Sequence, residues 1–142
     1  FTHQPDVAKK VLESAKQNRI TKQIEPDGGQ PRELARTKSW SYSTMNLDGM
    51  VELEQLGDAA GVDLWGFQTS DGRSVRKAID YLFPFATGDQ KWTHQQIEEF
   101  QPERLYTIMR RAARAYHDDG YNKMMAKVPT LADNDERRLL MF

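Results

Sequence analysis

The sequence contains no cysteine among its 142 residues. This absence excludes disulfides, thiolate metal sites and cysteine nucleophiles, but it leaves the cellular compartment open, since many exported proteins also lack cysteine. No run of about 18 apolar residues occurs, so the sequence predicts no membrane-spanning helix. Charge of one sign is not in excess either, because 20 basic and 21 acidic residues give a formal net charge of -1. The sequence therefore predicts neither a nucleic-acid nor a membrane partner, and an acidic ligand must be met by a local basic cluster.

The length and the first residues bound the domain organisation. A chain of 142 residues is enough for one domain, which would bury roughly 68–70% of the surface that its unfolded form exposes. Residues 1–6 contain no initiator methionine and no apolar signal-like run, and they read as the junction of two helices. We therefore expect an internal piece of a longer protein, with residues 1–128 in one helical unit and residues 129–142 as a C-terminal extension.

Apolar residues recur at helical spacing along most of the chain, and no stretch alternates convincingly with a period of two. The predicted class is therefore all-α. Proline and glycine suggest where the helices begin and end. The expected helices cover residues 5–22, residues 38–60 before Gly61, a segment from Val75 that Pro84 ends, residues 94–100, and a longer one from Pro102 that Gly120 ends, with one or two further turns over 121–127.

The segment 24–46, IEPDGGQPRELARTKSWSYSTMN, is the most informative part of the chain. It begins with turn-forming residues, PDGG, which end any helix that arrives from the N-terminal side. Basic and aromatic side chains follow on the way into the next helix, and these are Arg32, Arg36, Lys38, Trp40 and Tyr42. Cations beside aromatic rings and hydrogen-bonding groups are typical of a site for an acidic sugar.

Several parts of this segment resemble the alginate-lyase-type polysaccharide lyases, which have an (α/α) toroid fold. The matching parts are residues 27–31 (DGGQP), 33–37 (ELART), 41–43 (SYS) and 46–47 (NL). The resemblance extends over about residues 5–118 and implies part of an incomplete barrel of antiparallel helices. A helical solenoid is also disfavoured because the expected helices are unequal and show no fixed period of about 34 or 40 residues.

The resemblance also implies that part of the active site precedes this chain. In the resembled family, a helix that carries an Asn-His motif lies just before a segment like residues 1–24, and no Asn-His dipeptide occurs in this sequence. We therefore expect the missing N-terminal portion of the same protein to be a partner of this chain. For the same reason, we expect the chain alone to be inactive.

The chemistry of such a lyase can be built from residue types. Cleavage of a polyuronate by β-elimination removes the proton on C5, next to the carboxylate, and expels the glycosidic oxygen from C4. Arginine suits the neutralisation of the carboxylate, because its planar fork pairs bidentately and stays charged. Tyrosine suits the acid and base roles, because a phenol of pKa about 10 can be shifted by a neighbouring cation. No metal and no cofactor are expected.

These requirements, together with the resemblance, assign the catalytic roles to Tyr42 as acid and base and to Arg36 as the neutralising cation. Arg32 and Lys38 are alternatives to Arg36, because positions six apart on a continuous helix lie about 120° out of alignment. The residues expected to bind substrate are Gln30, Arg32, Lys38, Trp40 and Asn46. The predicted function is a secreted or periplasmic lyase acting on alginate or a related polyuronate, with the identity of the polymer left open.

Other interpretations of these residues remain open at this point. Tyr42 could be a tyrosine at the edge of the core with a tethered hydroxyl, and Arg36 could pair with Glu33. Toroid folds also host hydrolases with two carboxylates, for which the candidates are Asp48, Glu52 and Asp80. The histidines His3, His94 and His117 are too scattered for a metal triad. The alternative function is a non-catalytic helical module, in which the basic loop binds an acidic carbohydrate or protein.

Overall fold

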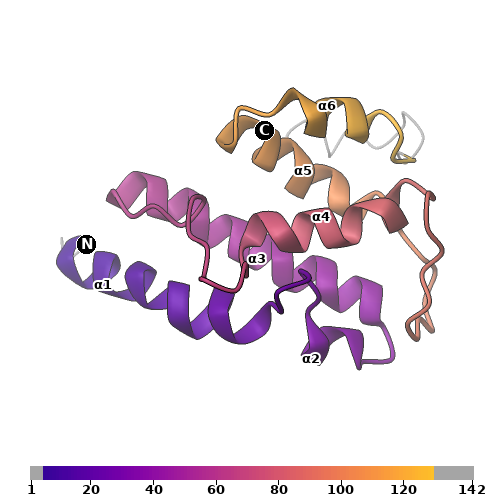
Figure 1. Ribbon diagram of the computed structural model, residues 1–142, viewed down its shortest axis with the longest axis horizontal. Coiled ribbons are helices and arrows are strands. Elements are labelled where there is room, and N and C mark those ends of the chain that lie inside the picture. Colours follow the sequence, from indigo (N-terminus) through magenta and orange to yellow (C-terminus); the bar gives the residue numbers. More distant parts are fainter. Residues whose placement is uncertain (1–4, 130–142) are drawn as a thin grey trace.

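The structure is a computed structural model, and it describes residues 5–129. Its elements are the helices α1 (Pro5–Ala15), η1 (Lys16–Thr21, a π-helix), α2 (Pro31–Leu34), α3 (Ser39–Ala60), α4 (Val75–Ala86), α5 (Arg104–Ala115) and α6 (Asp119–Met125). The described residues contain no strand, and the all-α prediction is confirmed. The longest helix, α3, contacts α1, α2, α4 and α5 and therefore forms the centre of the array (Figure 1). Within the described part of the chain, no helix is long and apolar enough to cross a membrane.

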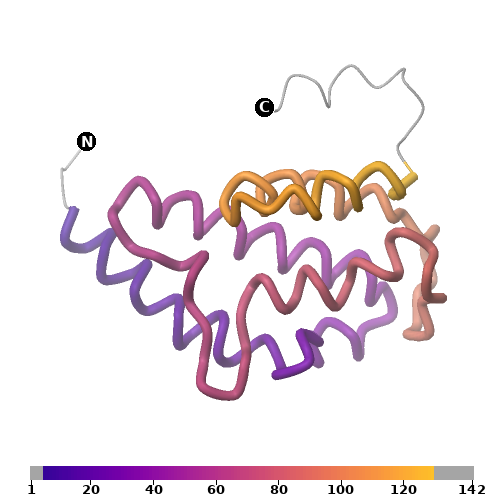
Figure 2. Tube along the Cα trace, turned by 45° about the horizontal axis from the view of Figure 1, so that its top comes forward, coloured from indigo at the N-terminus to yellow at the C-terminus, as the bar shows by residue number. Residues whose placement is uncertain are grey.

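The core lies where α3, α4 and α5 meet. Its side chains come from the inward faces of these helices, and burial of each large apolar side chain stabilises the fold by roughly 1.5–3 kcal/mol. Those that are at most 1% exposed include Trp40, Leu47, Val51, Ile79, Leu82, Leu105, Ile108 and Met109. The opposite face of α3 turns towards α1, η1 and α2, which lie on the other side of it (Figures 1 and 2).

The helix expected over residues 5–22 is present, but its last part is wider than an α-helix. The α-helical geometry of α1 ends at Ala15, and the chain continues as the π-helix η1. The hydroxyl of Thr21 donates a 2.8 Å hydrogen bond to the carbonyl of Lys16, five residues earlier, which supports the wider turn. Ile20 and Ile24 then reach the core at 2% and 0% exposure. Such π-helical turns are rare and often occur at functional sites.

The helix expected over residues 38–60 is confirmed as α3, and Gly61 ends it in the left-handed conformation with φ 70°. The helix expected over residues 94–100 is absent, and that prediction is wrong. Residues 95–97 instead pair with the start of α3, through Ser39 N to Gln95 O at 3.1 Å and Ile97 N to Thr37 O at 2.9 Å. The first N–H groups of a helix lack intrahelical acceptors. Here the carbonyl of Gln95 and the side chain of Gln96 provide acceptors for the N–H groups of Ser39 and Trp40, and a helix over residues 94–100 would move these acceptors out of reach.

Two helix ends also differ from the predictions. Pro84 does not end α4, which continues to Ala86, because Ala86 is buried in the core and the Thr87 N–H still bonds the Phe83 carbonyl at 3.1 Å. Helix α5 ends at Ala115 and not at Gly120. His117 adopts φ 50°, and Gly120 lies inside α6. The turns expected over 121–127 are confirmed by α6, whereas the predicted extension 129–142 lies outside the described residues except for Pro129.

One buried carboxyl makes the stability of the fold depend on pH. Glu54 of α3 is 1% exposed, and neither of its carboxylate oxygens has a partner among the described residues. Burial, together with smaller contributions from the neighbouring carboxylates Asp58 and Asp63, raises the pKa of Glu54 from 4.5 to about 9. The folded protein therefore keeps this carboxyl protonated where the unfolded chain ionises it. The resulting stability is fully present below pH 4.5 and is lost as the pH rises towards 9.

We predict that Glu54→Gln has little effect on the free energy of unfolding at pH 5 and stabilises the protein by about 2–4 kcal/mol at pH 8, because each pH unit in this window costs at most about 1.4 kcal/mol. Urea unfolding at both pH values measures this difference. The matched control is Glu52→Gln, which changes an exposed glutamate of the same helix. An effect of Glu54→Gln that is the same at both pH values would contradict the prediction.

Candidate functional site

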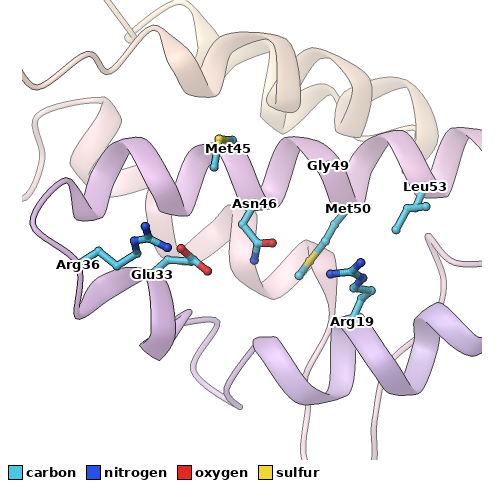
Figure 3. Close-up of a pocket in the computed structure, with 8 residues that line it drawn as sticks. All are labelled: Arg19, Glu33, Arg36, Met45, Asn46, Gly49, Met50 and Leu53. Atoms are coloured by element: carbon cyan, nitrogen blue, oxygen red, sulfur yellow. The ribbon is translucent and has the colours of Figure 1, made fainter.

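A groove runs beside α3, on the side of α3 that faces η1 and α2, and it encloses about 350 Å³. Its lining comes from η1, from α2 with the residues that follow it, and from α3 (Figure 3). The lining residues are Arg19, Glu33, Arg36, Met45, Asn46, Gly49, Met50 and Leu53. The five residues from α3 follow helical spacing, so they form one continuous face of that helix. We refer to this space as the α3 groove.

The structure brings Arg36 and Tyr42 together. Helix α2 ends at Leu34 and α3 begins at Ser39, so Arg36 lies in the turn between them. The turn folds back, and the guanidinium carbon of Arg36 stands 3.7 Å from the centroid of the Tyr42 ring. The misalignment expected for a continuous helix does not arise, since the two residues do not belong to one helix.

The hydroxyl of Tyr42 and the guanidinium of Arg36 form no hydrogen bond or ion pair with other side chains of the described residues. Tyr42 is half-buried, and no hydrogen bond among the described residues involves its hydroxyl. Arg36 is exposed. Although Glu33 lines the same groove, none of the ion pairs found within residues 5–129 joins it to Arg36. The alternatives of a tethered hydroxyl and of an Arg36–Glu33 pair are therefore not what the structure shows.

Gln30 and Asn46 form a hydrogen-bonded relay at the edge of the groove. Gln30 is 2% exposed, and its Nε2 donates to the Ser43 carbonyl at 3.1 Å. Its Oε1 accepts a 2.9 Å hydrogen bond from Nδ2 of Asn46, which does line the groove. Gln30, which was predicted to bind substrate, is therefore placed behind Asn46 and not on the surface of the groove. Because it is buried, Gln30 orients Asn46 and has no surface of its own for a ligand.

The turn before Gln30 depends on a glycine. Gly28 has φ 94°, a left-handed conformation, and a Cβ at this position would lie 2.1 Å from the carbonyl oxygen of Lys77 in α4. The N–H of Gly29 then bonds the Asp27 carboxylate at 2.8 Å, which closes the turn. The PDGG sequence therefore packs the chain against α4 and delivers Gln30 into the interior.

Trp40, which was predicted to bind substrate, is placed in the core and not on the surface of the groove. Its side chain is 0% exposed and packs against Trp92 and Phe100, with ring centroids 5.2 Å and 4.4 Å away. Its indole N–H donates to the Gln101 carbonyl at 2.7 Å. Neither ring face is open to a ligand. Trp40 therefore anchors the start of α3 in the core.

Lys38 and Arg32 are not brought into the groove. Lys38 forms an ion pair with Glu98. This hydrogen-bonded contact raises the pKa of the Lys38 ammonium and lowers the pKa of the Glu98 carboxyl. The charge of Lys38 is therefore compensated within the chain. Arg32 is exposed on α2 and does not line the groove. Arg36 is the member of the basic cluster that faces the groove.

The carboxylates considered for a hydrolase are engaged elsewhere. Asp48 pairs with Arg111 at 3.2 Å, and Asp80 accepts a 2.7 Å hydrogen bond from the Tyr121 hydroxyl. Neither of them lines the groove, and Glu52 is exposed outside it. Among residues 5–129, no group of three or more histidine, aspartate or glutamate side chains is placed to hold a metal ion.

Sequence reasoning missed Arg19, Glu33 as a lining residue, and the role of Gly49. Arg19 reaches the groove from η1, and the only local signal for it was a polar position within an amphipathic helix. Glu33 was considered only as a possible ion-pair partner of Arg36, and Gly49 was not considered as a site residue. Their common surface depends on how three elements pack, which residue spacing along the chain does not report.

Comparisons with known proteins identify a family for this chain. Residues 1–92 match the family model described as alginate lyase. The structure is also similar to the crystal structure of an alginate lyase from Bacteroides ovatus, with a TM-score of 0.86 and 33% sequence identity. That similarity covers 94% of this chain and 36% of the Bacteroides ovatus chain, so this chain spans about a third of that protein's length. No curated protein matches the chain.

The similarity in structure is consistent with the predicted toroid, and it accounts for an array whose helices pack around a central α3. The matched residues include η1, α2 and the whole of α3, which together line the groove. Since the family model matches most of its length, the chain belongs to the alginate lyase family.

Proposed function

We propose that this chain supplies one part of the active site of a polysaccharide lyase that cleaves alginate or a related polyuronate by β-elimination. The observation that carries the proposal is the contact between Arg36 and Tyr42. The guanidinium of Arg36 has no carboxylate partner among the described residues and lies 3.7 Å from the centre of the Tyr42 ring, at the end of a groove. An uncompensated cation beside a free phenol is the pair that the chemistry requires.

In this mechanism Arg36 pairs with the carboxylate of the sugar to be cleaved. Its positive charge stabilises the enolate-like charge that develops when C5 loses its proton. Tyr42 takes that proton through its phenol oxygen, the C5–H electron pair forms a C4=C5 double bond, and the C4–O bond breaks. The leaving oxygen then receives a proton from Tyr42. No water is consumed, and the products are an unsaturated sugar end and a new reducing end.

Asn46 and Glu33 would orient the substrate. Asn46 is held by Gln30 and keeps its carbonyl oxygen available for a sugar hydroxyl, and the Glu33 carboxylate accepts hydrogen bonds only. These two groups face the groove from α3 and from α2 (Figure 3). Hydroxyl groups of the sugar are suitable hydrogen-bond donors to both.

The remaining groups are proposed to come from outside this chain. We assign residues 1–128 to the C-terminal portion of a toroid, which an Asn-His pair on a preceding helix completes. The share of the Bacteroides ovatus enzyme that is matched, 36%, leaves room for such a portion. A polymeric substrate outside the cell favours a secreted or periplasmic location. Polyuronates differ in their C5 configuration and linkage, and no lining residue discriminates between them.

The first prediction concerns the reaction itself. The complete protein, incubated with polyuronates, should release unsaturated products that absorb in the ultraviolet, and a chelator should leave the rate unchanged because Arg36 provides the positive charge. The 142-residue chain alone should show no turnover. Loss of activity on chelation would contradict the mechanism, and binding without any cleavage by the complete protein would favour the non-catalytic module.

The second prediction separates the two catalytic roles. Tyr42→Phe removes one oxygen, so it should keep folding and polymer binding while lowering kcat by on the order of 10²–10⁴-fold, the usual effect of a positioned acid or base. Arg36→Ala should raise KM as well as lower kcat, because its charge meets the carboxylate both before and during the reaction. Steady-state kinetics of the complete enzyme measures both constants.

The outcomes of these kinetics discriminate between assignments. Near-full activity of Tyr42→Phe would make Tyr42 a packing residue and would remove the basis of the proposal. If Arg36→Ala leaves kcat and KM unchanged while Arg32→Ala or Lys38→Ala lowers activity, the proposed lyase function is retained. The assignment of Arg36 as the neutralising cation is then wrong. Arg36→Lys tests the need for the guanidinium fork, since lysine keeps the charge but not the bidentate geometry.

The third prediction tests the positioning role of Gln30. Gln30→Leu keeps a similar volume but removes the hydrogen bond to Asn46, so we expect a severalfold increase in KM together with a loss of stability of about 1–3 kcal/mol. A double-mutant cycle with Asn46→Ala separates the two effects. If Gln30 acts through Asn46, its effect on KM disappears in the Asn46→Ala background. Full additivity of the two changes in KM would contradict this role.

A further inference from the structure

A second arginine without a carboxylate partner lines the α3 groove at a distance along the helix from Arg36. The head groups of Arg36 and Arg19 both turn towards the space beside α3, and Asn46 stands between them (Figure 3). Arg36 comes from the turn before α3, whereas Arg19 comes from η1. The mechanism proposed above uses only one of these two cations.

The position of Arg19 follows from the π-helical turn that carries it. Ile20, the next residue, is 2% exposed and packs into the core, which fixes the rotation of the turn. The hydrogen bond from Thr21 to the Lys16 carbonyl holds the wider spacing on the other side. With these two residues fixed, Arg19 is directed to the groove and remains exposed.

Arg19 lines the groove without an ion pair to a carboxylate, in contrast to three arginines elsewhere in the described residues. Those three guanidinium groups pair with carboxylates as Arg73–Asp71 at 2.8 Å, Arg76–Asp118 at 2.6 Å and Arg111–Asp48 at 3.2 Å. Within residues 5–129, neither Arg19 nor Arg36 has such a pair, although Glu33 lines the groove with them. Two uncompensated cations along one groove suit a ligand that carries negative charges at intervals.

The floor of the groove is also unusually open. Gly49 lies in the interior of α3, where glycine is less favourable than alanine by roughly 0.8–1.0 kcal/mol. A Cβ at this position would meet nothing within 4 Å, so no packing contact requires the glycine. Its effect is to leave the α3 backbone approachable between Asn46 and Leu53, which also line the groove.

We infer that the α3 groove holds two successive uronate units, and that Arg19 binds the carboxylate of the unit next to the one that Arg36 neutralises. This inference rests on the proposed function and extends it from the cleaved sugar to its neighbour. A polyuronate carries one carboxylate on every sugar, so both cations find a partner along one chain. Arg19 therefore contributes to binding and to selection for uninterrupted uronate sequences, without a part in the proton transfers.

The test measures binding to the complete protein in a Tyr42→Phe background, so that the oligomers remain uncut. The probes are a uronic acid tetramer and the same tetramer after reduction of its carboxylates to alcohols, both titrated by calorimetry. Arg19→Ala should raise the Kd of the charged tetramer by on the order of 10-fold, as expected for the loss of a charge-assisted hydrogen bond. The Kd of the reduced tetramer should stay unchanged.

The matched control is Lys22→Ala, which removes a charge one turn further along the chain. Lys22 is exposed, its ammonium donates to Asn18 at 3.0 Å, and it does not line the groove. This variant should bind both tetramers like the background protein. An equal loss for both tetramers with Arg19→Ala, or no loss for either, would overturn the inference while leaving the lyase intact. Failure of the background protein to bind the charged tetramer would overturn the proposed function and this inference together.

A second variant, Gly49→Leu, tests the groove without changing any charge. Gly49→Leu places a good helix former in α3 and fills the open floor, so its melting temperature should equal or exceed that of the background protein. The Kd of the charged tetramer should nevertheless rise by on the order of 10-fold, because the side chain occupies the path of the second sugar. A variant that is equally stable and binds with unchanged affinity would overturn the placement of the polymer in this groove.

Discussion

The anchoring of Trp40 at the start of α3 is the constraint on which the rest of the site depends. The indole is fully buried between Trp92 and Phe100, and its N–H bonds the Gln101 carbonyl. The backbone N–H of the same residue is capped by the Gln96 side chain at 3.0 Å. The segment 92–101 therefore fixes where α3 begins, and with it the turn in which Arg36 folds back over Tyr42.

Once α3 is fixed, one of its faces packs into the core and the other lines the groove in which we propose that the substrate binds. Leu47 and Val51 are 0% exposed on the inner face, whereas Asn46, Gly49 and Leu53 line the groove on the other. The distribution of charge follows the same division. Lys38 and Arg111, which lie outside the groove, are compensated by carboxylates, and within the described residues the two arginines that line the groove are not. The groove is consequently a local cationic site in a chain with almost no net charge.

Local sequence signals predicted those features that depend on nearby residues. The all-α class, the long helix over 38–60 and its end at Gly61 follow from apolar spacing and from the left-handed preference of glycine, and all three are confirmed. The pairing of Arg36 with Tyr42 was predicted from the chemistry, and the short turn between α2 and α3 provides its geometry. The catalytic roles of the two residues stay predictions.

The features that were missed depend on contacts between distant segments. Residues 94–100 have a plausible helical pattern, but the unsatisfied N–H groups of α3 draw them into an extended pairing instead. An aromatic residue next to basic ones suggested a sugar platform at Trp40, yet its partners lie more than fifty positions later in the chain. Arg19 was not predicted as a groove residue because a π-helical turn directs it to the groove. The spacing of apolar residues does not predict that turn.

The most direct test of the central claim is a crystal structure of the complete protein carrying Tyr42→Phe with a bound uronate oligomer. The account predicts that the oligomer lies along the α3 groove, with one carboxylate paired to the Arg36 guanidinium at about 2.7–2.9 Å and its C5 atom facing the ring at position 42. An oligomer bound at another surface, with the groove left empty, would contradict it.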